Sequence, residues 1–484
     1  MNIITLDKSK RYLGLLAVVA FLATGCSSMR IVSMPPDMQV PTDFASNHTV
    51  HGDNTVSKSR VFADPFLVQL VDIAVKQNQD VQIAMQRIEA ARSFFKMRKG
   101  AMLPSVEAAA SASAQRYGDY TMEGVGNFDT NLSGNISEDQ KIALPIVPYY
   151  YLGLRSSWEI DLWGKLRNQK HAAYMRLLGA EQGRNLVVTS LVAEVASRYY
   201  DLVALDEELG ILQKNMSLQD SAVRVAEVQK EAGRANELGV QQFRAQLLRT
   251  RSLLLQTEQD IVRTENELNY LLGRFPQPVP RTKSFMDQPL PATMVAGLPQ
   301  DIMNRRPDVV QAELELKATQ ADVAAAKAAF LPSLTLAPFF GYNAFNSALL
   351  FNPGSLAYGV IGGLAAPLLN RSATKGNLTR SEAEKMEAYY RYNRTVINAF
   401  QEVQTTLTNM QNLRRIYDLN QQETQVLSDA IGTSNELFKV GYANYLDVIT
   451  AQRNALEAEI NQVETKKSLY ISLITLYRSS GGGW

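Results

Sequence analysis

The sequence predicts an α/β membrane protein built as an internal tandem repeat, in which strands share a β-barrel that long coiled-coil helices continue. Three observations predict this class. The spans 164–233 and 372–441 contain no internal proline, and at 1.5 Å rise per residue each forms a helical rod of about 100 Å, too long for a globular core. Short segments of alternating apolar and polar residues precede both rods. The same order of features also occurs twice along the chain.

The repeat is visible as matching residues in the two halves. Asp80-Val81 and the Leu-Pro-Ser at 103–105 recur as Asp308-Val309 and at 331–333, in both cases 228 positions later. The Gly-x-Ala-Asn at 233–236 recurs at 441–444, which is only 208 positions later. The first half therefore carries a longer loop before its second strand, and insertions of this kind lie on surfaces.

The predicted divisions follow from this repeat and from proline content. The first repeat occupies 64–275 and the second 300–484, and a proline-rich linker at 276–299 separates them. The segment 26–63 is polar with scattered prolines and no periodicity, which predicts an extended stretch packed over the body. Residues 1–25 are predicted to be a signal peptide.

The amino terminus carries the pattern of a secretory signal. Basic residues at positions 8, 10 and 11 precede an apolar run from Tyr12 to Leu22 and then Ala-Thr-Gly-Cys26. The run is about half as long as a bilayer crossing requires, which favours removal over anchoring. Cys26 is the only cysteine, and its setting resembles a bacterial lipobox, so we expect it to carry lipid. An ordinary cleavage site followed by an idle thiol is the alternative.

Strands are predicted at 105–117, 149–160, 333–342 and 356–366. Along the second strand, alternate residues are mostly apolar, namely Tyr150, Leu152, Leu154, Trp158 and Ile160. Tyr358, Val360 and Leu364 match them in the last strand. Apolar-out and polar-in alternation is typical of a membrane barrel, although a soluble sheet with one wet face is the alternative. The segments 118–138 and 343–354 predict exposed turns, since they are rich in Gly, Asn, Asp and Ser.

Long helices are predicted at about 164–232, 237–272, 372–440 and 445–478. Their apolar residues step by three and four, as coiled-coil packing requires. Gly233 and Gly441 end the first and third of them, since glycine readily adopts the left-handed conformation that a tight turn between helices needs. A shorter helix is predicted to begin at Pro307, where the missing N–H is tolerated, and to end before Pro332.

The sequence lacks the residue patterns of catalysis. The only histidines are His48, His51 and His171, and none has cysteine or carboxylate partners at ligand spacing. No phosphate loop or nucleophile motif is present, so we expect no enzyme activity, no metal and no cofactor beyond the lipid on Cys26. The net charge is +1 with both signs interspersed, which argues against nucleic acid as a partner.

Strand number predicts an oligomer. Four strands cannot close a membrane barrel, and open sheet edges are not tolerated in lipid, so several chains must share one barrel. Two chains would supply about eight strands, whose interior side chains fill, whereas three would supply about twelve and leave a channel. Three copies of the chain, a homotrimer, are therefore the smallest number that would leave a channel.

Three motifs carry a resemblance to a known family. They are Leu-Pro-x5-Arg-Arg-Pro-Asp-Val at 298–309, the paired Leu-Pro-Ser, and SSWEIDLWGKLRN at 156–168. With them the chain resembles the outer-membrane factor family, the TolC-like and OprM-like exit ducts of tripartite systems. The resemblance implies a trimeric 12-stranded barrel in the bacterial outer membrane and a helical tunnel in the periplasm. It also implies a periplasmic membrane-fusion adaptor and an inner-membrane pump of the resistance-nodulation-division type as partners.

The resemblance places the candidate site at the two helix-to-helix turns. We expect these turns to form the periplasmic tip and to contact the adaptor through Gly233, Ala235, Asn236, Gly441, Tyr442, Ala443 and Asn444. Asp447 matches an aspartate at the closed constriction of TolC-like members, with Arg234 as a possible closing partner. Thr450 stands where the TolC branch has a second aspartate, and Gly239 is the counterpart of Asp447 in the first repeat. The alternative is that Asp447 only stabilises the first turn of its helix.

The predicted function is a passive exit duct for drugs or other toxic compounds delivered by an inner-membrane pump. A structural coiled-coil lipoprotein or adhesin is an alternative that the long helices alone would permit, and the exit duct of a type I polypeptide secretion system is another. Single-channel conductance in lipid separates a duct from a scaffold. The cargo does not follow from the sequence, because selectivity would reside mainly in the pump.

Overall fold

A computed structural model describes residues 34–35, 40–44, 64–290, 299–367 and 371–482. The predicted signal peptide, Cys26 and most of the segment 26–63 lie outside the described residues. The chain divides into Met1–Gln39 and Val40–Trp484, and every feature below belongs to the second unit. Among the helices in the described ranges, none has an apolar stretch long enough to cross a bilayer.

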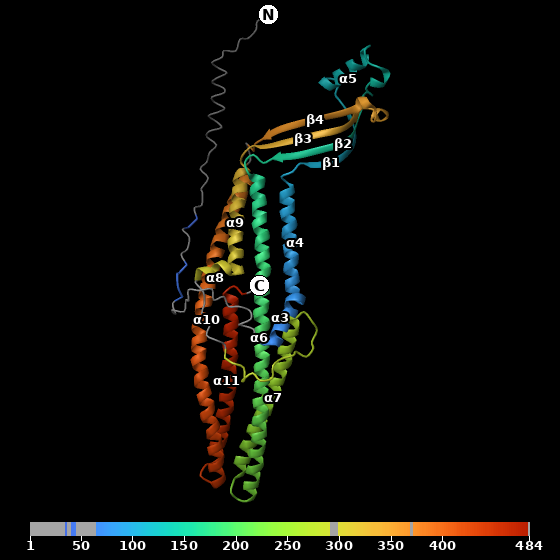
Figure 1. Cartoon of the computed structure of the whole chain (residues 1–484). Helices are drawn as coiled ribbons and strands as arrows, with labels where there is room; N and C mark the ends of the chain where they lie inside the picture. Colours follow the sequence, from blue (N-terminus) through green and yellow to red (C-terminus); the bar gives the residue numbers. More distant parts are fainter. Residues whose placement is uncertain (1–33, 36–39, 45–63, 291–298, 368–370, 483–484) are drawn as a thin grey trace. The chain divides into compact units, whose positions relative to one another are not determined.

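Two helical hairpins account for most of the second unit. Helix α6 (Lys165–Glu231) turns back into α7 (Glu237–Leu271), and α10 (Ser372–Val440) turns back into α11 (Tyr445–Ser479). The ends of these four helices differ from the predicted positions by at most one residue. The two hairpins lie alongside each other (Figure 1), and α11 packs against α6.

Four shorter helices of the described residues pack with the two hairpins. They are α3 (Pro65–Gln77), α4 (Gln79–Gly100), α8 (Pro299–Arg305) and α9 (Pro307–Ala328). Helix α9 begins at Pro307, as the sequence predicts. The side chain of Asn78 accepts hydrogen bonds from the N–H groups of Asp80 and Val81, which fixes the start of α4. Helices α4, α6, α9 and α10 pack in that order as one layer.

The strands form one antiparallel sheet in the order β1-β2-β3-β4. They are β1 (Ser105–Arg116), β2 (Ile146–Ile160), β3 (Ser333–Ala344) and β4 (Leu356–Ala365). Strand β2 begins three residues before the predicted start at 149. Pairing of β2 with β3 is interrupted opposite Pro338, because proline has no N–H to donate.

The loop between β1 and β2 departs from the prediction of exposed turns, because it contains a helix. Thr121 is the N-cap of helix α5 (Met122–Leu132), and its hydroxyl accepts a hydrogen bond of 3.0 Å from the N–H of Gly124. Short 3₁₀ turns follow at Glu138–Gln140 in this loop and at Ser347–Leu349 and Pro353–Ser355 in the second one. The capping hydroxyl and Glu123 in the first turn favour the helix, although the segment buries no side chain.

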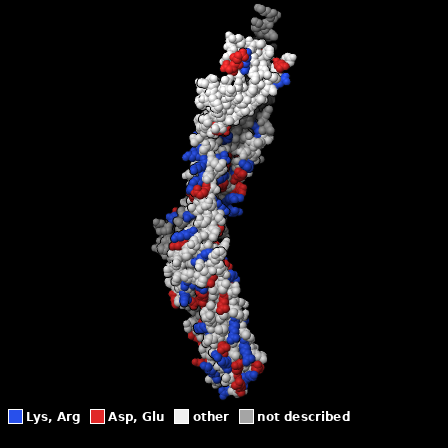
Figure 2. All heavy atoms as spheres, turned by 90° about the vertical axis from the view of Figure 1, so that its right-hand side faces the viewer, with Lys and Arg blue, Asp and Glu red and all other residues white. Residues whose placement is uncertain are grey.

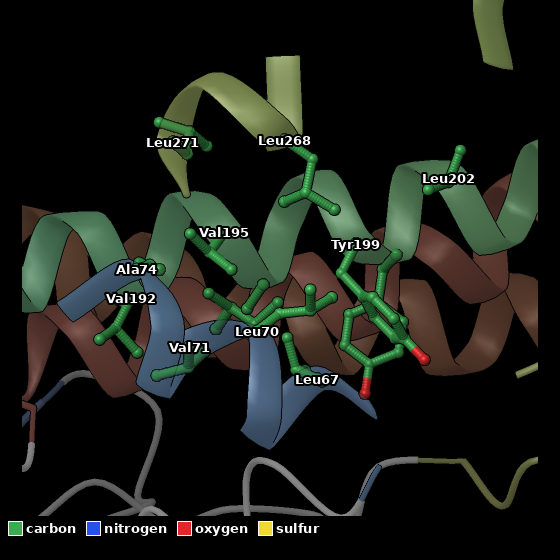
Figure 3. Packing of buried hydrophobic residues seen from close by; sticks show 14 of the residues in the cluster. Leu67, Leu70, Val71, Ala74, Val192, Val195, Tyr199, Leu202, Leu268 and Leu271 are labelled. Carbon is green, nitrogen blue, oxygen red and sulfur yellow. The ribbon is translucent and has the colours of Figure 1, made fainter. Parts of the chain in front are cut away.

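The main hydrophobic core lies where α3 crosses α6. Figure 3 shows Leu67 and Leu70 of α3 beneath Val195 and Tyr199 of α6, with Leu268 of α7 on the far side of α6. All five side chains are buried, as are Leu473 and Tyr477 of α11. The core therefore ties the first hairpin to the second about midway along the long helices.

Candidate functional site: the sheet and the two hairpin ends

The sheet has one apolar and one polar face. Cross-strand pairing places Leu154 beside Ala108 of β1 and Phe340 of β3, and Phe340 beside Tyr358 of β4. These side chains share a face, because directly paired residues point to the same side. Tyr358 is 74% exposed. Figure 2 shows the sheet almost without charge, whereas basic and acidic side chains are interspersed along the helices.

The opposite face is polar. Arg155 of β2 is paired with Glu107 of β1, and its guanidinium lies 4.3 Å from the ring centroid of Tyr151. Asn343 of β3 donates a hydrogen bond of 2.9 Å to the Tyr149 hydroxyl. The polar groups of this face therefore lie mainly on β1 and β2 and at Asn343 of β3, whereas β4 contributes glycine, alanine and Ile361 to it.

Both edges of this sheet are open. Among the strands in the described ranges, β1 pairs only with β2 and β4 pairs only with β3. Each edge presents unpaired N–H and C=O groups, which are a template for pairing with another strand. A sheet with one apolar face and two open edges would leave the backbone groups of those edges unpaired in a lipid bilayer.

The turns that end the two hairpins have the same backbone. Gly233 and Gly441 have φ values of 70° and 85°, in the left-handed region. Arg234 N–H donates to the Gln229 carbonyl at 2.8 Å, and Tyr442 N–H donates to the Leu437 carbonyl at 2.9 Å. Gly441 N–H donates to Phe438 and Gly233 N–H to Lys230 in the same way. Both turns are Schellman motifs, in which the carbonyls of the last helical turn are satisfied.

The returning helices begin differently. Asn236 accepts a hydrogen bond from the N–H of Gly239 at 2.9 Å. Asn444 accepts from the N–H groups of Leu446 and Asp447, and the Asp447 carboxylate accepts from the Asn444 N–H at 2.9 Å. This reciprocal pair is a capping box. Within one chain, the Asp447 carboxylate therefore forms part of the capping box at the start of α11.

The proposed gate residues are not joined within one chain. Asp447 and Arg234 are both exposed and form no ion pair with each other in the described structure, and Thr450 is half-buried one turn beyond Asp447. Of the residues proposed for adaptor contact, Tyr442 is 86% exposed, and Asn236 and Asn444 are also exposed. Ala235 and Ala443 are partly covered by their own turns.

A small apolar cluster, which we call the end cluster, joins the two turns. Phe243 of α7, 2% exposed, lies 6.2 Å from Phe438 of α10 between ring centroids, and Val448 of α11 is buried in the same cluster. A Cβ at Gly239 would lie 3.1 Å from the Tyr445 ring. This contact accounts for glycine at the first-repeat counterpart of Asp447, because an aspartate there would need the ring to move.

A buried polar network around the proline-rich segment was not predicted from the sequence. Asp64 accepts hydrogen bonds from the Tyr199 and Thr282 hydroxyls, and Lys466 donates to the carbonyls of Met286 and Gln288 at 2.8 and 2.6 Å. Burial lowers the pKa of the Lys466 ammonium, which is 1% exposed. The described part of the predicted linker is therefore packed onto α6 and α11. The available signal was Lys466, which lies on the same helix face as the buried Val463, Tyr470 and Leu473.

Burial also raises the pKa of Tyr470 to about 12, and its hydroxyl donates a hydrogen bond of 2.6 Å to the Pro289 carbonyl. The phenol therefore stays neutral and keeps its proton for that bond. Within the described ranges, no three His, Cys, Asp or Glu side chains gather into a group that would hold a metal ion.

Comparisons with known proteins agree with this geometry. A family model described as outer membrane efflux protein matches residues 70–274 and 298–482. The probable outer membrane lipoprotein SilC of Salmonella typhimurium is 26% identical over 470 residues, which cover 96% of this chain and 97% of SilC. The pyoverdine export outer membrane protein OpmQ of Pseudomonas putida is 30% identical over 426 residues, which cover 88% of this chain and 87% of OpmQ.

Solved structures agree on the fold. A membrane protein from Pseudomonas aeruginosa matches with a TM-score of 0.81 and 25% identity, covering 94% of this chain and 100% of that one. The outer-membrane channel OprN matches with a TM-score of 0.80 and 25% identity, covering 93% and 99%. The fold is that of the TolC-like ducts. With the family model matching both repeats, the chain belongs to the outer membrane efflux protein family.

Proposed function

We propose that three copies of the chain form a passive exit duct, with a shared 12-stranded barrel in the outer membrane and the helical hairpins in the periplasm. The two open edges of the sheet are the observation that supports this proposal most directly. In a closed barrel, β1 of one copy pairs with β4 of the next, and no edge remains in the lipid. Three copies are the smallest number that leaves a channel, since about eight strands are filled by their own side chains.

The partners follow from the position of the two turns. We propose that the hairpin ends contact a periplasmic adaptor through the residues of both turns, and that an inner-membrane pump supplies the energy. The exposed aromatic ring of Tyr442 supports this contact, since aromatic side chains are enriched at protein interfaces. Lipid on Cys26 would add a second attachment to the outer membrane, as the lipoprotein name of SilC supports.

The relatives differ in cargo. Their names include cation efflux for CusC of Escherichia coli, toluene efflux for TtgC and pyoverdine export for OpmQ, both of Pseudomonas putida. We infer that the pump sets the cargo of this chain too, which leaves drugs, metal ions and other toxic compounds open.

Two measurements test the trimeric duct. Purified protein in a planar bilayer should conduct in discrete steps, whereas a coiled-coil scaffold would not. The double variant Ala109→Cys/Ile361→Cys places one thiol on each edge strand, both on the face of Arg155, and a flexible bismaleimide should then give a ladder that ends at the trimer. Each single variant should give no ladder, because β1 of one copy lies beside β4 of the next and never beside another β1, and the same holds for β4. A ladder that ends at the dimer, or a bilayer without conductance, would overturn the proposal.

A further inference from the structure

A groove with a volume of about 750 Å³ crosses the layer of α4, α6, α9 and α10. Its wall includes residues of all four helices, from Ala84 of α4 to Thr395 of α10. These two helices are the outer members of the layer, since α4 packs on α6, α6 on α9 and α9 on α10. A groove that both outer helices reach lies on the concave side of the layer. In the proposed trimer, on which this step rests, the concave side faces the axis of the duct.

The groove is lined with arginine. Its basic side chains are Arg87, Arg176, Arg184, Arg391 and Arg394. They come from three helices, and on α6 the lining residues recur at steps of three and four, so one continuous helix face is involved. Gly179 and Gly183 lie on that face and face α9. A Cβ on Gly183 would lie 3.1 Å from the Gln311 amide, and a Cβ on Gly179 would lie 3.9 Å from Leu314.

Nearby carboxylates neutralise only part of this charge. Arg176 donates to Glu315 at 3.1 Å and to Asp322 at 2.7 Å. Arg391 pairs with Glu387 at 2.6 Å. The remaining carboxylate of the wall, that of Asp308, is held at 2.8 Å by Arg306 behind it.

Three arginines of the groove keep their charge uncompensated. Within the described residues, no carboxylate lies at ion-pair distance from Arg87, Arg184 or Arg394. The Nε of Arg184 is also buried without a hydrogen-bond partner, although its Nη1 reaches the side chain of Asn185. A guanidinium presents a planar fork that matches carboxylate and phosphate oxygens, and an unsatisfied buried N–H favours such a ligand.

We propose that this groove is an anion-binding site on the inner wall of the duct and that it binds molecules bearing carboxylate or phosphate groups. The symmetry of the trimer places three grooves around one axis and makes a positive belt between the sheet and the hairpin ends. The belt raises the local concentration of passing anions, because charges of one sign in a channel with low-dielectric protein walls focus the field. Small cations cross the same belt less readily.

Inorganic pyrophosphate is a suitable probe. Added to the wild-type trimer in a planar bilayer, it should lower the conductance, and the triple variant Arg87→Gln/Arg184→Gln/Arg394→Gln should raise the half-blocking concentration about tenfold or more. In a KCl gradient, the triple variant should also shift the reversal potential toward the cation limit. Arg249→Gln is the matched control, since Arg249 is an exposed arginine of α7, which contributes nothing to the groove, and it should behave as wild type.

The outcomes separate this proposal from the duct itself. Equal half-blocking concentrations in the wild type and the triple variant would overturn the proposed anion-binding site but would leave the duct proposal standing. If no preparation conducts, the duct proposal fails, and titration calorimetry of the detergent-solubilised proteins with pyrophosphate still tests the groove. If pyrophosphate binds the wild type and not the triple variant, the anion-binding site is supported. If it binds both equally, the site is refuted.

Discussion

At the end of the α6–α7 hairpin, two ion pairs connect neighbouring helical segments, Lys230 with Glu237 and Arg244 with Glu227. Among the described residues at the end of the α10–α11 hairpin there are none, and the capping box of Asn444 and Asp447 is found instead. The backbone is nevertheless the same, with glycine at positive φ and asparagine at the following N-cap in both.

The difference teaches which features of a duplicated turn depend on backbone geometry and which are free to diverge. Left-handed φ restricts the residue at 233 and 441, and the first N–H groups of a helix need an acceptor, so glycine and asparagine are found in both repeats. Charge is not restricted in this way. The Lys230 hydrogen bond holds the pKa of Glu237 below its ordinary value, but the pair is open to solvent and salt screening leaves it a minor contribution.

The largest effect is expected in the end cluster, where the two hairpins meet. Phe243→Ala should lower the local stability of both hairpin ends by about 3–5 kcal/mol, because a buried aromatic ring is replaced by a cavity. Hydrogen exchange at 225–250 and 435–455 measures it. Val228→Ala is the control, since Val228 is 64% exposed on the same hairpin. Loss of protection in only one hairpin would contradict a cluster shared by both.

The next effect concerns the two glycines. Gly441→Val should destabilise the turn by about 1–3 kcal/mol, because a β-branched residue is strained at φ of 85° although no atom lies within 4 Å of a new Cβ. Gly233→Val should cost a similar amount, since its φ is 70° and its surroundings are equally open. Thermal unfolding and efflux in a complementation assay measure the two variants, and Gly441→Asn serves as a control that tolerates left-handed φ.

If Gly441→Val left both folding and efflux unchanged, the importance of this turn would be disproved. If it lowered efflux while unfolding stayed the same, contact with the adaptor would account for the loss. The comparison with Gly233→Val then tells which of the two hairpin ends the adaptor uses more.

Much of this fold was predictable because its signals are local. Gly233 and Gly441 mark their turns by residue type, Pro307 marks the start of α9, and the alternation from Tyr150 to Ile160 marks β2. Family membership was predictable from the motif that contains Arg306 and Pro307. Arg306 of this motif is buried and binds Asp308, Glu402 and the Ser479 carbonyl, so it joins α9 to α10 and α11.

The remainder depends on contacts between distant segments. Helix α5 was missed because its glycines and asparagines outweigh a single threonine cap in any composition-based prediction. The network of Asp64 and Lys466 joins residues separated by most of the chain. The arginine groove joins Arg87, Arg184 and Arg394 from three helices, and none of them is distinctive alone. No residue pattern within a single helix reveals that kind of site.

A smaller effect separates the two N-caps. Asn444→Ala should destabilise its hairpin end by about 1 kcal/mol, because Asn444 accepts two backbone hydrogen bonds. Asn236→Ala should cost less, since Asn236 accepts one and belongs to no capping box. Urea unfolding of the hairpin ends, followed by hydrogen exchange, ranks the two. If Asn236→Ala were the more destabilising variant, the ion pairs Lys230–Glu237 and Arg244–Glu227 would depend on the cap that Asn236 forms.

The smallest effect on stability, and the most informative about the gate, is expected at Asp447. Asp447→Asn keeps a side-chain oxygen that can accept the hydrogen bond from the Asn444 N–H, so the capping box survives and only the charge is lost. We expect its stability to change by a few tenths of a kcal/mol, the contribution of one exposed charge at a helix start. Asp447→Ala removes both the bond and the charge and should cost more.

The two variants therefore separate capping from gating. In a trimer, three Asp447 carboxylates would form an acidic ring, and the ring has no contribution from the first repeat because Gly239 packs against Tyr445. If the ring acts as the gate, Asp447→Asn should lower the cation preference of the reconstituted duct and change its closed-state leak as much as Asp447→Ala does. If Asp447→Asn leaves both at the wild-type level while Asp447→Ala frays the helix start, the carboxylate serves only the capping box. The positive belt proposed higher in the duct would then be the main charge selector of the channel.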